Sequence, residues 1–209
     1  MKKVKQIIEL LKQEYPEPKC ELDYSAPHEL LIAARLSAQC TDKRVNLVTP
    51  ALFEKYRSVR EFAAADVSDI EQLVKTCGLF KTKAADIAGM CVMLCEAHGG
   101  VIPCEMDELL KLPGVGRKTA NLIRGELFSQ PAIVADTHVM RLSGRLGLVN
   151  EPINPLLTEK TLTKLIPAGE SMAFCHRLVL HGRRVCKARS PGCGNCCLKN
   201  TCNHYKNML

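Results

Sequence analysis

The sequence has no apolar run long enough to cross a membrane. Nowhere in its 209 residues does an uninterrupted apolar stretch approach the length of about 18 that marks a transmembrane helix. The first 18 residues also lack the unbroken apolar core of a signal peptide, because Val4, Ile7, Ile8 and Leu11 recur at helical spacing among Lys and Glu. We therefore expect a cytoplasmic protein with no membrane partner, associated with the nucleoid if the source is bacterial.

Strand patterns, repeats and low-complexity segments are missing as well. No segment alternates between apolar and polar residues for long enough, between turn signals, to predict a strand. Helix signals recur instead: Pro27 opens a segment, Thr41 caps the next, and Ser58–Glu61 and Ser68–Glu71 form capping boxes. The pattern predicts an all-α protein with helices over 27–40, 42–56, 81–98, 106–111, 117–128, 137–146, 156–166 and 171–184.

Cysteine is abundant, and its distribution is uneven. Without a secretory signal, a disulfide framework for the 12 cysteines is disfavoured. Seven of them are scattered before residue 176, mostly in apolar periodic segments where a free cysteine acts as a small buried hydrophobe. The other five lie within residues 186–202. This crowding indicates a metal centre.

Four of these five cysteines have a spacing suited to one inorganic centre, Cys186-x6-Cys193-x2-Cys196-x5-Cys202. Both Zn²⁺ and a [4Fe–4S] cluster accept four cysteine thiolates, and the spacing alone does not choose between them. We expect Cys197 to be outside the ligand set, because the adjacent Cys196 and Cys197 cannot easily point at one centre.

The net charge of +7 favours nucleic acid only weakly by itself, but the cations are clustered. One group lies beside the cysteines and another surrounds a glycine-rich turn. The two groups are Arg183, Arg184, Lys187 and Arg189, and Arg117, Lys118 and Arg124.

That turn is the segment Leu112-Pro113-Gly114-Val115-Gly116-Arg117-Lys118-Thr119-Ala120. Pro113 should end one helix, the glycines should turn the chain, and a second helix should begin near Arg117. Backbone N–H groups at such a turn can bind a DNA phosphate, although a plain helix–helix turn has the same pattern. A dinucleotide-binding turn fits less well, because Thr119 replaces the third glycine and no strand precedes it.

Lys118, beside this turn, and Asp136, farther along the chain, are two further residues whose positions the pattern indicates. On a helical wheel Ala120, Ile123 and Leu127 form an apolar stripe opposite Lys118, which therefore points away from the core. A solvated surface lysine has the same pattern. Asp136 precedes a helix and is expected to be its N-cap, which is compatible with catalysis because a cap lies at an exposed helix mouth.

These features, in this order, resemble the endonuclease III family of helix-hairpin-helix DNA glycosylases. The resemblance covers nearly the whole chain. Its motifs are Leu36-Ser37-Ala38-Gln39-Cys40-Thr41-Asp42, Gly78-Leu79-Phe80-Lys81-Thr82-Lys83-Ala84, the Leu112–Ala120 hairpin, Val134–His138, and Leu180-His181-Gly182-Arg183 before the cysteine loop. Cys40 departs from the pattern, since relatives commonly have a small residue such as Ala there.

The resemblance implies a two-lobed helix-hairpin-helix DNA glycosylase fold. Residues 20–130 would form a six-helix domain with the hairpin at about 106–128. Residues 1–19 and 131–209 would form a domain with a C-terminal [4Fe–4S] cluster loop, ligated by Cys186, Cys193, Cys196 and Cys202.

The resemblance also implies a function in base excision repair. The protein would act as a monomer on duplex DNA that contains damaged pyrimidines or abasic sites. It would remove oxidised pyrimidines and cleave 3′ to the abasic site by β-elimination, with Lys118 as nucleophile and Asp136 as catalytic carboxylate. Gln39 and Leu79 would fill the vacated stack. The further DNA contacts would be Gly114, Val115, Gly116, Arg117, Lys187 and Arg189.

Two alternatives can be tested against the sequence. A monofunctional adenine-removing relative would lack the hairpin lysine and have a catalytic Glu before Gln39, whereas this chain has Lys118 and no carboxylate between Leu30 and Gln39. A non-catalytic DNA-binding module would use only the hairpin and the metal loop. Nicking of an abasic site separates an enzyme from such a module.

Overall fold

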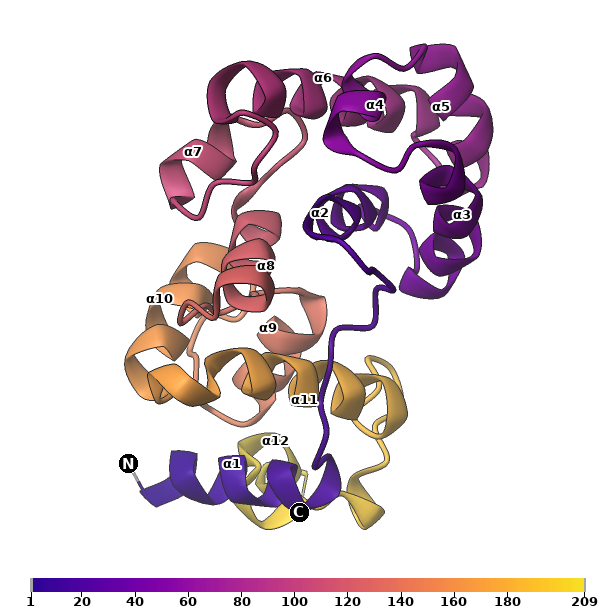
Figure 1. Ribbon diagram of the computed structural model, residues 1–209. Helices are drawn as coiled ribbons and strands as arrows, with labels where there is room; N and C mark the ends of the chain where they lie inside the picture. The colour runs from indigo at the N-terminus through magenta and orange to yellow at the C-terminus, as the bar shows by residue number, and fades with distance from the viewer. Residues whose placement is uncertain (1, 209) are drawn as a thin grey trace. The chain divides into compact units, whose positions relative to one another are not determined.

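A computed structural model describes residues 2–208, and this part of the chain is helical (Figure 1). No strand occurs among these residues, which confirms the predicted all-α class. None of the described helices combines the length and apolarity that a membrane-spanning segment needs. The α-helices are α1 (Lys2–Glu14), α2 (Pro27–Leu36), α3 (Asp42–Lys55), α4 (Val59–Ala63), α5 (Val67–Val74), α6 (Phe80–His98), α7 (Met106–Lys111), α8 (Arg117–Phe128), α9 (Thr137–Arg145), α10 (Pro155–Leu165), α11 (Ser171–Arg184) and α12 (Asn203–Lys206). Four short 3-10 turns complete the list: η1 (Lys75–Cys77), η2 (Ala168–Glu170), η3 (Cys193–Asn195) and η4 (Lys199–Thr201).

The chain divides into two compact units. One unit is Cys20–Phe128 and contains α2 to α8. The other joins the residues up to Lys19 with those from Ser129 onward, so that α1 belongs with α9 to α12. We call them the hairpin unit and the cysteine unit.

The hairpin unit is built around α2 and α6. Every residue from Leu30 to Ala34 is buried, and α6 adds Ile87, Met90 and Leu94 to the same core. Phe62 of α4 is fully buried and packs at an angle against Tyr56, with ring centroids 5.1 Å apart. The result is a single continuous apolar core.

Most helix boundaries in this unit follow the expected signals. Pro27 is in the first turn of α2, Thr41 caps α3 by accepting from the Arg44 N–H, and Ser58 caps α4 by accepting from the Glu61 N–H. Gly99 ends α6 in the left-handed conformation, where a glycine has no steric penalty.

Two boundary predictions in this unit are wrong. The helix expected over 27–40 ends at Leu36, because Ser37 caps it and Gln39 has a positive φ of 53°. The capping box expected at Ser68–Glu71 does not form. Asp66 caps α5 instead, and its carboxylate accepts from the Ser68 N–H, so Ser68 lies inside the first turn.

In the cysteine unit, the N-terminal helix packs on α11, as Figure 1 shows at the foot of the picture. The apolar stripe expected from its spacing (Val4, Ile7, Ile8 and Leu11) is buried. Polar contacts hold the end of the helix: Arg177 donates to the Tyr15 carbonyl at 3.1 Å, and Lys12 pairs with Glu170 at 2.6 Å. Residues far apart in sequence therefore share one core.

Candidate functional site

The glycine-rich turn between α7 and α8 forms the expected hairpin. Gly114 has a φ of 71°, a left-handed conformation that favours glycine. A Cβ at this position would collide with the side chains of Arg35 and Asp86, which form an ion pair at 2.6 Å beside the turn. Only glycine therefore fits at position 114.

Val115 and Gly116, the next two residues of the turn, differ in their surroundings. The Val115 side chain is buried, and its N–H donates to the Leu112 carbonyl at 3.1 Å. Val115 thus shapes the turn and does not offer the open N–H expected of a phosphate contact. A Cβ at Gly116 would meet nothing within 4 Å, so the approach to the start of α8 is open. The first N–H groups of a helix have no partner within the helix, and they favour an anion.

Lys118 lies in the first turn of α8 and is exposed. Ala120 and Ile123 are buried completely, as the helical wheel predicted for the opposite face. Arg117, one residue earlier, is exposed too. The lysine amine is therefore presented to solvent beside an open, anion-binding helix start.

Gln39 and Leu79 are both exposed and both left-handed. Their φ angles are 53° and 47°, and Leu79 is 56% exposed. A residue with a side chain in this region costs about 1–3 kcal/mol and persists only where its surroundings impose it. Two exposed side chains on strained backbone thus project from two loops of the hairpin unit.

In the cysteine unit, Asp136 caps α9. Its carboxylate Oδ1 accepts from the Val139 N–H at 2.7 Å, and the residue is half-buried. The N-cap role considered from the sequence is therefore present. The carboxylate lies at the mouth of the helix, where its negative charge is stabilised by the helix dipole.

The cysteine loop is attached to α9 by an arginine. Arg145 donates to the carbonyls of Lys187 and Ala188, both at 2.8 Å, and to the Cys186 sulfur at 3.2 Å. The loop side chains Lys187 and Arg189 remain exposed. Arg145 thus fixes the backbone of a loop whose own cations, Lys187 and Arg189, are exposed.

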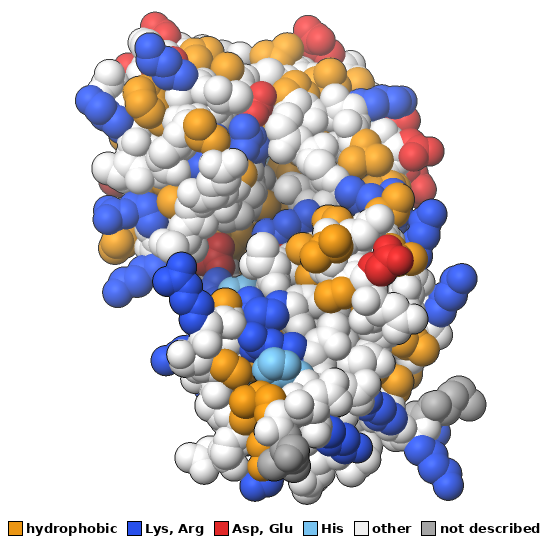
Figure 2. Space-filling model, turned by 180° about the vertical axis from the view of Figure 1, so that it is seen from behind, with side chains coloured by type: hydrophobic (Ala, Val, Ile, Leu, Met, Phe, Trp, Pro, Cys, Tyr) orange, Lys and Arg blue, Asp and Glu red, His pale blue; other side chains and the backbone are white. Residues whose placement is uncertain are grey.

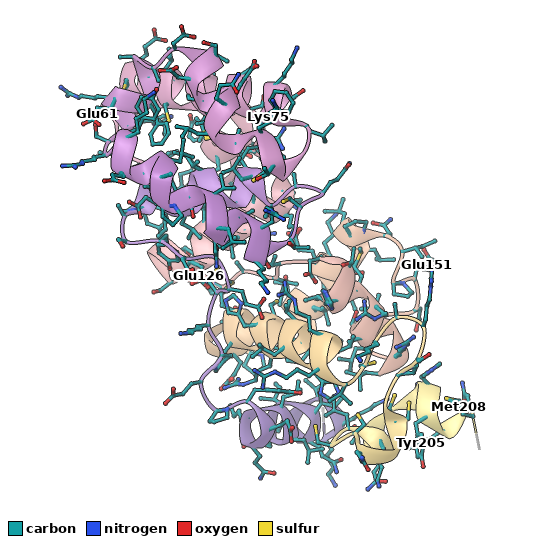
Figure 3. The ribbon with its side chains drawn as sticks, turned by 90° about the vertical axis from the view of Figure 1, so that its right-hand side faces the viewer. Glu61, Lys75, Glu126, Glu151, Tyr205 and Met208 are labelled. Carbon is teal, nitrogen blue, oxygen red and sulfur yellow. The ribbon has the colours of Figure 1, made fainter. Side chains whose placement is uncertain are left out.

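The four expected ligand cysteines line one small cavity. Cys186, Cys193, Cys196 and Cys202 share it with residues that include Gly192 and Tyr205, and Cys197 is outside the lining. Tyr205 is labelled in Figure 3. His181 contacts the Cys196 sulfur through Nε2 at 3.3 Å. Among the described residues, no three His, Cys, Asp or Glu side chains are arranged to hold a single metal ion.

Positive charge is concentrated in the cysteine unit. That unit has 16 Lys and Arg against 7 Asp and Glu, a net charge of +9, whereas the hairpin unit has 13 against 15, a net charge of −2. Lys and Arg also outnumber Asp and Glu on the face drawn in Figure 2. The excess of positive charge, which favours a polyanion, therefore lies in the cysteine unit.

Sequence reasoning missed two cations that hydrogen-bond to loop carbonyls, Lys83 and Arg145. Lys83 is completely buried, and a signal for this was available: Lys83, Ile87, Met90 and Leu94 follow the spacing of one apolar helix face. Arg145 carried no such signal, because an arginine near the C-terminal end of a helix is commonplace.

The sequence was compared with protein-family models and with curated proteins, and both comparisons give matches. The family model "HhH-GPD superfamily base excision DNA repair protein" matches residues 32–168. The chain is 46% identical to endonuclease III of Synechocystis sp. over 94% of this chain and 90% of the relative. It is 42% identical to endonuclease III of Bacillus subtilis over 97% and 92%. Against endonuclease III of Escherichia coli K12 the identity is 38%, over 97% and 96%.

Two solved structures are similar over nearly the full length. A non-covalent endonuclease III–DNA complex superposes with a TM-score of 0.93 at 43% identity, covering 99% of this chain and 97% of that chain. A trapped covalent endonuclease III–DNA intermediate gives 0.92 at 44% identity, covering 98% of each. The chain therefore belongs to the endonuclease III family of the HhH-GPD base excision DNA repair superfamily.

Proposed function

We propose that this chain, a base excision repair DNA glycosylase and AP lyase, removes oxidised pyrimidines from duplex DNA and cleaves the strand through a Schiff base on Lys118. The observation that carries the proposal is the exposed amine of Lys118 beside the open start of α8, at Gly116. A covalent DNA intermediate trapped with a protein 44% identical to this chain supports a nucleophile of this kind. We also propose that the hairpin unit is the domain for which the resemblance implies six helices, although its described residues form seven α-helices, α2 to α8. The cysteine unit would be the iron–sulfur domain, and the protein would act as a monomer.

The first step is extrusion of the damaged nucleotide. A base within a duplex is out of reach, and flipping it costs a few kcal/mol, least for a damaged pair. N–H groups at the start of α8, together with Arg117, would hold the backbone on one side, and Lys187 and Arg189 would contact phosphates from the cysteine loop. Gln39 and Leu79, both exposed, would occupy the space that the flipped nucleotide leaves.

Lys118 is the nucleophile in the steps that follow. Its neutral amine attacks C1′ of the sugar, the glycosidic bond breaks and the base departs with the bonding electron pair. Ring opening gives an imine between Lys118 and C1′. Loss of a proton from C2′ breaks the C3′–O bond, so the strand is cut on the 3′ side, and hydrolysis of the imine restores the lysine.

Asp136 has an electrostatic role in this scheme. The sugar gains positive charge as the base leaves, and a carboxylate stabilises that charge. The half-buried position of Asp136 strengthens the effect, since charges interact more strongly away from bulk water.

The chemistry of the cysteine cavity suits a [4Fe–4S] cluster. Four cysteines line one cavity, and such a cluster takes four cysteine thiolates. A cluster distributes its four cysteines over several irons. When bound, the cluster would cross-link the loop and leave no open position for water, which makes its role structural.

The proposal is tested on duplexes that each contain one defined lesion. The protein should release oxidised pyrimidines and nick the product, and it should also nick a pre-formed abasic site. Binding without nicking of the abasic duplex would mean that the chain is a DNA-binding module. Release of the base without nicking would mean a monofunctional glycosylase.

A further inference from the structure

A lysine with no access to solvent lies between two loops of the hairpin unit. Lys83, in the first turn of α6, is 0% exposed. Its ammonium donates to the Leu36 carbonyl and to the Cys77 carbonyl, both at 2.8 Å. A buried charge is costly unless it is hydrogen-bonded, so this cation has a specific structural purpose.

Each acceptor carbonyl lies just before a strained residue. Leu36 is the last residue of α2, three positions before Gln39, and Cys77 is the last residue of η1, two positions before Leu79. Gln39 and Leu79 both have positive φ. Lys83 therefore connects the starts of the two loops through hydrogen bonds. The second loop follows η1, whose first residue, Lys75, is labelled in Figure 3.

The chemistry of the acceptors explains why a cation is there. The last carbonyls of a helix have no partner within it and form the negative end of its dipole, so an ammonium is favoured beside them. Burial lowers the pKa of Lys83, and the neighbouring thiols of Cys40 and Cys77 oppose that effect. An apolar side chain of similar length, such as Met, would leave both carbonyls without this donor.

We propose that Lys83 is a positioning residue, which fixes the loops of Gln39 and Leu79 at one spacing so that both side chains enter the DNA stack together. The proposal rests on the stack-filling role given to Gln39 and Leu79 under the proposed function. It extends that function, because it names a residue that does not itself contact DNA but determines where the side chains of Gln39 and Leu79 lie.

The test uses a duplex with one tetrahydrofuran abasic analogue, which cannot be nicked, and 2-aminopurine opposite it. Binding of wild type should change the fluorescence of 2-aminopurine as its neighbours are displaced. Lys83→Met should lose at least half of that change while its Kd rises by less than about threefold, because the hairpin and the cysteine loop are intact. Its kcat for excision of an oxidised pyrimidine should fall at least tenfold.

A matched control removes the same charge from the same helix. Lys81 is exposed, two residues from Lys83. Lys81→Met should retain the fluorescence change, and equal losses in both variants would show that only net charge matters. Lys83→Arg, which keeps the charge and several donors, should recover most of the fluorescence change lost in Lys83→Met. A wild-type fluorescence change and kcat in a folded Lys83→Met would overturn the proposal.

Two further measurements keep the test decisive. If Lys83→Met does not fold by circular dichroism, hydrogen exchange of the wild type replaces it: residues 37–41 and 76–80 should exchange no faster than the adjoining helix ends. Exchange within seconds would contradict loops held in advance. Nicking of an authentic abasic duplex by wild type reports separately on the proposed function, so the two failures are distinguishable.

Discussion

At the scale of single residues, the two glycines of the hairpin, Gly114 and Gly116, have different surroundings although the sequence pattern does not distinguish them. Gly114 is required by the protein itself, since it has positive φ and lies against the Arg35–Asp86 ion pair. Gly116 has open space in front of it. Nothing in the described structure therefore requires glycine at position 116, and we expect its small size to matter for an approaching DNA backbone.

Replacement of each glycine by alanine tests this separation. Gly114→Ala should lower the free energy of unfolding by at least about 1–2 kcal/mol, the cost of a left-handed alanine. Gly116→Ala should lower it by less than about 1 kcal/mol but weaken binding to an abasic duplex several-fold. Thermal unfolding and a DNA titration measure the two effects, and a destabilised Gly116→Ala with normal affinity would reverse the assignment.

The two functions of Asp136 can also be separated. Asp136→Asn keeps an oxygen that can accept from the Val139 N–H, so the cap of α9 and the melting temperature should be nearly unchanged. Base release should slow by a factor of 100 or more, since one lost electrostatic contact costs about 2.7–4 kcal/mol in such sites. Nicking of a pre-formed abasic site should suffer less, because that aldehyde needs no glycosidic cleavage. Equal slowing of both reactions would place Asp136 in imine formation instead.

At the scale of the structural elements, the cysteine loop combines a cavity lined by four cysteines with a backbone that Arg145 holds. Cys186 is both a lining residue of the cavity and an acceptor of the Arg145 hydrogen bond. The same arginine holds the Lys187 and Ala188 carbonyls. The cysteine-lined cavity and the basic segment are thus parts of one folded element.

Serine substitutions distinguish the ligands from their neighbour. Protein purified without oxygen should be yellow-brown and contain about four irons per chain. Cys193→Ser should lose colour and iron, whereas Cys197→Ser should keep both because Cys197 is outside the cavity lining. Absorbance and iron analysis decide the matter. One equivalent of zinc in colourless wild type would contradict an iron–sulfur centre.

The sequence predicted whole helices better than it predicted their ends. Periodicity placed every long helix, because burying an apolar face requires it. The end of α2 was missed because no glycine or proline marks it, and the chain turns through a left-handed glutamine. Asp66 was passed over as the cap of α5 because Ser68 begins an equally good local pattern, and tertiary packing decides between such neighbours.

At the scale of the whole molecule, the charge distribution matters more than the net charge. The cysteine unit has a net charge of +9, so the sequence-wide value of +7 understates it. Lys187 and Arg189 lie on its exposed loop. Counterion release gives each neutralised phosphate a slope of about −0.9 in log K against log salt.

The salt dependence of DNA binding tests the contribution of Lys187 and Arg189. Lys187→Ala combined with Arg189→Ala should make the slope shallower by about two units if each residue neutralises one phosphate. Lys160→Ala combined with Lys164→Ala, on α10, removes the same charge from the same unit and serves as a control with a smaller expected effect. An unchanged slope in the loop variant would remove the cysteine loop from the interface.

The candidate site was predictable from the sequence only where the chemistry is local. The hairpin lysine, the aspartate cap and the cysteine spacing are each contained in a short segment. The resemblance supplied their roles, and those roles remain predictions. Lys83 and Arg145 depend on contacts between segments 40 or more residues apart, such as Lys83 with Leu36 and Arg145 with Lys187. Such contacts exist only in the folded chain.

The most direct test of the account is borohydride trapping. Borohydride added during turnover reduces the imine to a stable amine, so wild type should become covalently linked to a duplex with one oxidised pyrimidine. Lys118→Gln has no nucleophilic amine, so trapping and strand cleavage should vanish while binding survives through backbone N–H groups of the hairpin. If Lys118→Gln is trapped as efficiently as wild type, another amine is the nucleophile and the central assignment is wrong.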